Sequence, residues 1–431
     1  MNVIEEIKTG HTRYYKVSCY TADNKLISSR KIKYIIKSKT INQIRYFLIF
    51  DMNGRLVEQA YQYINFYKGY MAETSKREIT FHIRQLHEFS EIINKDISYF
   101  KITDINKLIV FLKGYDSRSI LADNLYLYSN KSEATVSDIL GFLKDYVKFC
   151  GYSSYKYFKM ANVRHSNKNN KNNLNVVCPK FISLYEMKKI LNYIKNDDSL
   201  SYETKLKYIL IYRLMFNRGM RIGEVLGLTY EDFEKFHTDT IIGYKVYIRN
   251  RYSDNLKQRA KRCLAMDGEY TYNSPEYHIL DIGYQQVFIN EEFYEDIMEY
   301  FDIMSARFKK EGKEMTRADS VYGQNTNWYI FYNLNRATPL NKDIFSVYTR
   351  KMFKDLGIHI DKSKRSNNLL HRFRHGFCMY LLFVEKIPPI EACKLTRHRN
   401  MESLSVYNNP TEEMIIKLLE KVEEGIQYGI K

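Results

Sequence analysis

Residues 217–228 read NRGMRIGEVLGL and follow the apolar, helical stretch Leu206–Phe216. Gly219 permits a left-handed turn, after which a new helix begins with Arg221 near its N-terminus. Glu224 lies three residues further on and therefore shares a helix face with Arg221. An arginine held in this way presents a rigid guanidinium fork, whose parallel N–H donors match two oxygens of a phosphate. The segment predicts a phosphate-binding arginine, with a purely structural Arg–Glu pair as the alternative.

A second basic cluster lies at residues 368–377, which read NLLHRFRHGF. Helical spacing places His371 beside Arg374, so that the two side chains form another donor set of the size of a phosphate. His371 and His375, at i and i+4, are an alternative metal-binding pair, but no acidic ligand is nearby in the sequence. Arg372 and Arg374 would also repel a cation. We therefore predict no metal site.

The third cluster lies towards the end of the sequence, at residues 395–407, which read LTRHRNMESLSVY. It contains His398 and, nine residues later, Tyr407. A single tyrosine carries no information in a chain that has 39 of them. The order of the clusters is informative: an arginine with its glutamate, then a His–Arg pair, then a histidine, then a tyrosine.

These ordered motifs resemble those of the tyrosine recombinases, the family of phage integrases, Xer-type recombinases and related transposases. Residues 219–228 are similar to the family's Gly-Leu-Arg-x-x-Glu-Leu-x-x-Leu box, with Glu224 at its acidic position. Residues 371–375 match its His-x-x-Arg-His box, and the spacing from His398 to Tyr407 matches its last box. The start of the chain, a strand with an Asn-Gly turn before the first helical bundle, most resembles integrases and transposases of Gram-positive mobile elements.

The resemblance implies a site-specific recombinase that cleaves and rejoins DNA strands through a covalent 3′-phosphotyrosine intermediate. It implies that Tyr407 is the nucleophile and that Arg221 and Arg374 hold the non-bridging oxygens of the scissile phosphate. His398 would donate a further hydrogen bond, and His371 would assist removal of the phenol proton. Because the phosphotyrosine conserves the energy of the phosphodiester bond, we expect no need for ATP, a metal ion or another cofactor.

The family also places a lysine in a β-hairpin turn after the first arginine box, where it protonates the leaving 5′ oxygen. The corresponding region, Asp254–Cys263, offers Lys257 and Lys261. We choose Lys261, because Arg259-Ala260-Lys261 resembles the form found in transposases.

Two adjacent positions depart from the family pattern. The family usually has Leu-Gly before the histidine of the last box, whereas this chain has Thr396-Arg397. We therefore expect a less tight approach of the backbone to His398.

The distribution of apolar residues divides the chain into four parts. We predict the fold class α+β, mainly α. Residues 1–65 alternate apolar and polar positions, which predicts a small strand-rich N-terminal region. Residues 66–164 contain three amphipathic helices, interpreted as the helical core-binding domain that clamps DNA. Residues 165–177 form a polar, Asn-rich linker. Residues 178–431 form a mostly helical catalytic domain with a small β-sheet, and the family resemblance covers residues 70–431.

Composition agrees with a DNA-binding protein, although a basic chain that merely stays soluble has the same composition. The 431 residues include 67 Lys and Arg against 50 Asp and Glu, a net charge of +17, which favours double-stranded DNA as the partner. Residues 1–10 show no apolar core of a secretory signal, and no apolar run approaches the ~18 residues of a membrane span. The six cysteines show no CxxC spacing. We therefore expect a cytoplasmic protein without a membrane segment.

The residues after Tyr407 predict a further contact. Apolar side chains recur at helical spacing over Met414–Gln427. In the family the C-terminal helix often docks on a neighbouring protomer, which implies self-association on DNA as a tetrameric synapse. Folding back onto its own domain is the alternative.

Two other functions fit parts of the pattern. A type IB topoisomerase-like enzyme would use the same chemistry to relax DNA without a specific site. A non-catalytic DNA-binding protein on the same scaffold would have no use for two arginines and two histidines beside a tyrosine. The favoured role is integration, excision or transposition of a mobile element.

Overall fold

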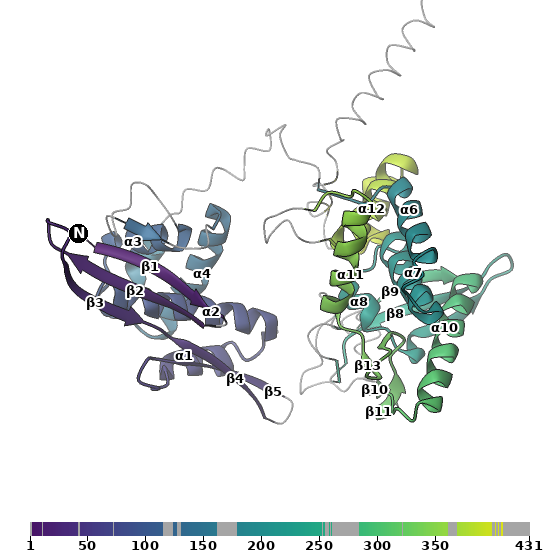
Figure 1. Ribbon diagram of the computed structural model, residues 1–431, viewed down its shortest axis with the longest axis horizontal. Coiled ribbons are helices and arrows are strands. Elements are labelled where there is room, and N and C mark those ends of the chain that lie inside the picture. The colour runs from purple at the N-terminus through teal and green to yellow at the C-terminus, as the bar shows by residue number, and fades with distance from the viewer. Residues whose placement is uncertain are drawn as a thin grey trace, which may run out of the picture. The chain divides into compact units, whose positions relative to one another are not determined.

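The computed structural model describes residues 2–10, 12–41, 44–71, 73–114, 124–126, 131–161, 179–251, 253, 254, 258, 260, 284–320, 322–360, 369–398, 401, 404 and 407. The chain divides into two compact units, Met1–Asn172 and Asn173–Lys431, each with its own hydrophobic core (Figure 1). The predicted linker at 165–177, both candidate hairpin lysines, Lys257 and Lys261, and the predicted helix Met414–Gln427 lie outside the described residues.

The first unit opens with strands in two sheets. A four-stranded sheet has the order β3-β2-β1-β6, in which β6 runs parallel to β1 and the other neighbours are antiparallel, and β4 and β5 form a separate hairpin. The strands are β1 (Asn2–Thr9), β2 (Thr12–Tyr20), β3 (Leu26–Ile32), β4 (Ile35–Ile41), β5 (Ile44–Phe50) and β6 (Asn124–Tyr126). The strands expected within residues 1–65 are therefore present.

The helices of the first unit pack onto these strands. They are α1 (Glu58–Gln62), which continues as a π-helical turn over Tyr63–Tyr67, α2 (Glu73–Ile92), α3 (Ile102–Lys113), α4 (Glu133–Phe149) and α5 (Tyr155–Met160), with a 3-10 turn at Ile97–Tyr99. Their apolar faces share one core with the strands, in which Ile4 and Tyr15 from the sheet meet Phe89 and Phe111 from the helices. Burial of these faces, rather than helix propensity, supplies most of the stability of such helices.

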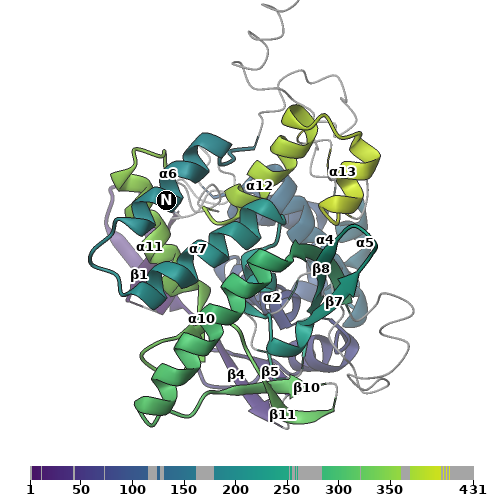
Figure 2. The same ribbon diagram turned by 90° about the vertical axis from the view of Figure 1, so that its right-hand side faces the viewer.

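The second unit is built around α7, whose side chains are buried on most sides. Figure 2 shows α7 among α6, α10 and α12, all of which pack against it. The helices are α6 (Leu184–Lys195), α7 (Tyr202–Asn217), α8 (Ile222–Leu226), α10 (Glu291–Lys310), α11 (Lys342–Asp355), α12 (His371–Met379) and α13 (Pro389–Leu395), with a 3-10 turn at Tyr230–Asp232 and a π-helical extension of α12 at Tyr380–Val384.

Small sheets complete the second unit. The largest is an antiparallel sheet of order β7-β8-β9, which corresponds to the strands expected after the first arginine box. The strands are β7 (Phe233–His237), β8 (Ile242–Arg249), β9 (Tyr284–Asn290), β10 (Arg317–Ser320), β11 (Gly323–Trp328), β12 (Tyr332–Asn333) and β13 (Thr338–Pro339). The predicted fold class, α+β with mainly helical structure, is confirmed. Within the described ranges, no helix combines the length and apolar character needed to cross a membrane.

Candidate active site

The loop that carries the first arginine begins where α7 ends. Gly219 has φ +58°, so the predicted left-handed turn is present. A Cβ atom on Gly219 would lie 2.4 Å from Cδ1 of Phe377 on α12. Glycine is therefore required both for the backbone conformation and for the close approach of α12.

Arg221 and Glu224 form the pair that their spacing predicts. Arg221 is the N-cap of α8, and its backbone N–H donates to Oε2 of Glu224 at 2.9 Å. Its Nη1 donates to Oε1 of Glu224 at 2.6 Å. The glutamate side chain is fully buried, whereas 18% of the Arg221 side chain is exposed. The structural Arg–Glu pair thus exists, and it holds the guanidinium at an accessible position, as phosphate binding requires.

Arg374 connects all three sequence clusters. It lies on α12, is 1% exposed, and donates through Nη1 to the carbonyl oxygen of Gly219 and through Nη2 to that of Thr396. Burial and the neighbouring Arg221 guanidinium lower the pKa of Arg374 to about 10, against the influence of Glu224. Two neighbouring guanidinium groups that repel each other favour an anion between or beside them.

Tyr407 lies in the electrostatic field of both arginines. The residue is 4% exposed, and its phenol lies near the thiol of Cys378 on α12. Burial is the main cause that raises the pKa of the phenol well above its usual range, and Cys378 adds to this, while Arg374 and Arg221 act in the opposite direction. The phenol is therefore neutral in the structure described, and the groups that stabilise a phenolate are close by.

The predicted histidines lie around the same phenol. The ring of His398 is 5.9 Å from that of Tyr407, and its Nδ1 is 2.5 Å from Oγ1 of Thr396. The ring of His371 is 4.4 Å from that of His375, which in turn lies 5.3 Å from the ring of Tyr407.

His375 is a site residue that the sequence motifs did not assign. Burial and the neighbouring Arg374 and Arg372 guanidiniums lower its pKa to about 4, so it is uncharged at neutral pH. His375 is the last residue of the His-x-x-Arg-His box, so the motif contained it without indicating a role for it.

The two residues before His398, where the chain departs from the family pattern, are buried. Arg397 has φ +55°, the left-handed conformation that glycine adopts readily, and its side chain is 7% exposed. Its guanidinium forms an ion pair with Glu224, at 2.6 Å between Nη2 and Oε2. Arg397 therefore adds a third guanidinium to the cluster around Glu224.

The segment on which the lysine prediction falls is described only at Asp254, Gln258 and Ala260. A Cβ on Gly227, at the end of α8, would lie 2.3 Å from the carbonyl oxygen of Gln258. Asn250 exchanges two hydrogen bonds with the backbone of Ala260, at 2.6 and 3.1 Å. Of the described residues between Lys257 and Lys261, Gln258 therefore lies against the end of α8, and Ala260 lies against Asn250, which follows β8.

The structure brings most of the predicted site together. Arg221, Arg374 and His398 lie near the phenol of Tyr407, Glu224 binds Arg221, and His371 lies beside His375, which packs against the phenol. Among the described residues, no three His, Cys, Asp or Glu side chains are placed to hold a metal ion.

The chain matches the model of the phage integrase family over residues 180–414, which is more than half of its length. The chain belongs to the phage integrase family. The match spans every predicted site residue, from Arg221 to Tyr407, and the resemblance to tyrosine recombinases is confirmed.

A solved recombinase structure shares the fold of this chain at low sequence identity. The XerH site-specific recombinase, in a post-cleavage complex with palindromic difH substrate, is 15% identical, with 81% of this chain and 80% of that chain covered and a TM-score of 0.52. The Tn1549 transposon integrase, in complex with a circular intermediate DNA, is 14% identical, with 85% and 98% covered and a TM-score of 0.47. No curated protein matches the sequence.

The carboxylate of Glu224 makes the stability of this phage integrase family member dependent on pH. Burial opposes its ionisation, but Arg397, Arg221 and Arg374 outweigh burial and lower its pKa from 4.5 to about 2. A depressed carboxyl pKa stabilises the folded state above the unfolded pKa, and this contribution is lost as the pH falls from about 4.5 towards 2.

Glu224→Gln is therefore expected to lower the free energy of unfolding by about 3 kcal/mol at pH 7. Urea unfolding of both proteins from pH 7 to pH 3 measures the difference, which should be constant down to about pH 5 and shrink below it. Glu391→Gln, an exposed site on α13, is the control and should change stability by less than about 0.5 kcal/mol. A difference that does not depend on pH would contradict the assignment.

Proposed function

We propose that the protein is a site-specific DNA recombinase, which cleaves and rejoins strands of duplex DNA through a covalent bond between Tyr407 and a 3′ phosphate. The observation that supports this most strongly is the placement of a buried phenol in the field of Arg221 and Arg374, which come from different parts of the chain. The XerH and Tn1549 proteins with the same fold were both solved in complexes with DNA.

The chemistry is mostly stabilisation of charge. The oxygen of Tyr407 attacks phosphorus, the bond to the 5′ oxygen breaks, and the two non-bridging oxygens gain negative charge in the transition state. Arg221 and Arg374 bind these oxygens, and His398 donates a further hydrogen bond. His371 assists removal of the phenol proton, and the hairpin lysine, Lys261, supplies the proton that the leaving 5′ oxygen needs.

Burial is the chief cause that raises the pKa of the Tyr407 phenol in the structure described. Arg374 and Arg221, which would hold the scissile phosphate, act in the opposite direction and favour the phenolate during attack.

The biological role that fits these parts is integration, excision or transposition of a mobile element. Double-stranded DNA is the partner, and the net charge of +17 favours its binding. Four protomers would assemble on DNA, with the helix predicted at Met414–Gln427 as the contact between them. A cytoplasmic location is part of the proposal, because the protein acts on DNA.

A capture experiment tests the proposal and finds the target sequence at the same time. The protein is incubated with DNA fragments that span and flank its own gene, denatured, and digested with protease. Fragments with a 3′ peptide and a 5′-hydroxyl, which polynucleotide kinase labels directly, are expected at one or a few sites. Absence of covalent adducts would contradict the proposal, and relaxation of any plasmid by the monomer would favour a topoisomerase-like enzyme.

EDTA is expected to leave the rate of adduct formation unchanged. The guanidinium groups supply the positive charge at the phosphate, and the phosphotyrosine retains the bond energy for rejoining. Adduct formation on the captured site is compared in about 5 mM Mg²⁺ and in about 10 mM EDTA at constant ionic strength, because salt alone changes DNA affinity. Loss of more than about tenfold in EDTA would show that a metal ion takes part.

A further inference from the structure

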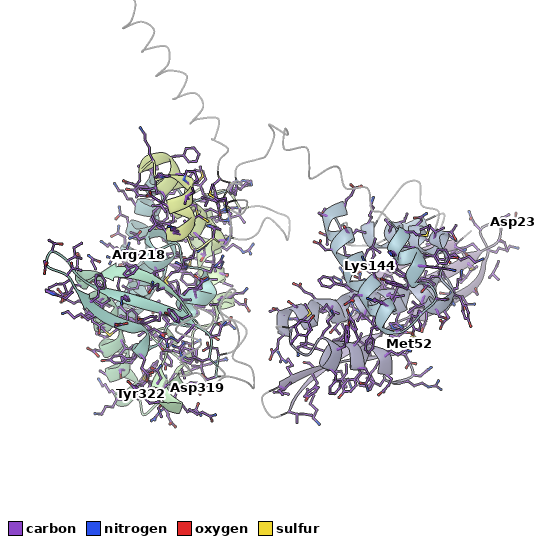
Figure 3. All side chains as sticks on the ribbon, turned by 180° about the vertical axis from the view of Figure 1, so that it is seen from behind. Asp23, Met52, Lys144, Arg218, Asp319 and Tyr322 are labelled. Carbon is purple, nitrogen blue, oxygen red and sulfur yellow. The ribbon has the colours of Figure 1, made fainter. Side chains whose placement is uncertain are left out.

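Arg397 contacts the loop that carries Arg221. Its Nη2 donates to Oε2 of Glu224 at 2.6 Å and to the carbonyl oxygen of Gly219 at 3.4 Å. Its Nη1 donates to the carbonyl oxygen of Arg218 at 3.3 Å; Arg218, at the end of α7, is labelled in Figure 3. One buried guanidinium therefore holds both ends of the segment from Arg218 to Glu224.

The two oxygens of the Glu224 carboxylate accept hydrogen bonds from the side chains of two different arginines. Oε1 accepts from Nη1 of Arg221, and Oε2 accepts from Arg397 and from the backbone N–H of Arg221. An isolated Arg–carboxylate pair tends to be bidentate, with both oxygens on one guanidinium. With Oε2 taken by Arg397, the Arg221 guanidinium is bound to Glu224 at Nη1 alone within the described residues.

The charges near Glu224 are consequently unbalanced. Arg221, Arg374 and Arg397 bring three positive charges to one buried carboxylate, and Arg397 is the strongest of the three influences that keep Glu224 ionised. Without Arg397, one carboxylate would neutralise Arg221. With it, Arg221 keeps positive charge at the partly exposed edge of the cluster.

The backbone at Arg397 supports a specific role. A side chain in the left-handed region costs roughly 1–2 kcal/mol, and such conformations concentrate at functional sites. The carbonyl oxygen of Gly219 accepts from both Arg374 and Arg397, so the two arginines fix the same turn.

We propose that Arg397 is a positioning residue: it occupies one oxygen of Glu224 and thereby leaves the charge and the N–H donors of Arg221 available to the scissile phosphate. The inference rests on the proposed function and concerns the same site. It predicts that Arg397 affects the cleavage step more than the binding of DNA, since its own side chain is buried.

The test uses Arg397→Gly, because glycine accepts the left-handed backbone and removes only the guanidinium. Single-turnover adduct formation on the captured site, at saturating protein, is expected to slow about 10–100-fold. Non-covalent DNA affinity, measured with Tyr407→Phe in the same background, should change less than about threefold. Lys394→Ala, which removes an exposed positive charge on α13, is the matched control and should retain the wild-type rate.

A neutral substrate separates positioning of charge from a merely structural effect. On a duplex with a methylphosphonate at the scissile position, the non-bridging negative charge is absent, so the loss caused by Arg397→Gly should shrink to less than about fivefold. Equal losses on both substrates would overturn the proposal. If the glycine variant does not fold, Arg397→Asn takes its place with the same criterion, since asparagine tolerates the left-handed backbone and carries no charge.

The outcomes distinguish the two proposals. Absence of adducts with the wild-type protein would contradict the proposed function itself. Wild-type adducts together with an unaffected Arg397→Gly variant would leave the proposed function intact and overturn the inference about Arg397.

Discussion

Tyr407→Phe is expected to abolish covalent attachment to DNA, with a loss of at least about 10³-fold in adduct formation, while DNA binding stays within about threefold of wild type. The substitution removes only the attacking oxygen. Phenylalanine fills the same buried space, so the variant is expected to fold as the wild-type protein does. Denaturing gels with labelled target DNA measure the adduct, and gel shifts measure binding.

The control for this variant is another tyrosine of the same unit. Tyr380 lies on the extension of α12, where its hydroxyl donates to Glu385 at the surface. Tyr380→Phe should form adducts at the wild-type rate. Adducts that persist in Tyr407→Phe would exclude Tyr407 as the nucleophile.

Arg374→Lys is expected to slow adduct formation by about 10²–10³-fold, because a donor to the developing charge is lost or displaced. Lysine also cannot span the carbonyl oxygens of Gly219 and Thr396, which Arg374 binds with its two Nη atoms. A buried carbonyl left without its donor costs roughly 1–3 kcal/mol. Single-turnover cleavage and urea unfolding measure the two effects separately.

The matched control is two residues away on the same helix. Arg372 is also buried and donates to the carbonyl oxygen of His359 at 2.6 Å, with its guanidinium 6.0 Å from the ring of Phe353. Arg372→Lys should lower stability by a similar amount but slow cleavage less than about tenfold. Equal loss of cleavage in both variants would mean that the effect of Arg374 is only structural.

Local features of the sequence predicted the parts of the site. Gly219 and the Arg221–Glu224 pair are set by backbone conformation and by neighbours three residues apart, so spacing alone indicated them. The same is true of His371 and Arg374 on α12. The order of these motifs along the chain also indicated the family. These predictions succeed because helix geometry fixes which nearby residues share a face.

The sequence alone did not indicate which charged side chains from distant segments pair with each other. Arg397 and Glu224 are 173 residues apart, and their ion pair depends on how α13, the Gly219 turn and α12 pack. Likewise, His375 rather than His371 packs directly against Tyr407, because the phenol approaches α12 from a remote segment. Contacts between remote segments depend on burial and packing in three dimensions, which spacing along the chain does not report. The sequence therefore determined the motifs, and the tertiary structure determined which charged groups of different motifs interact.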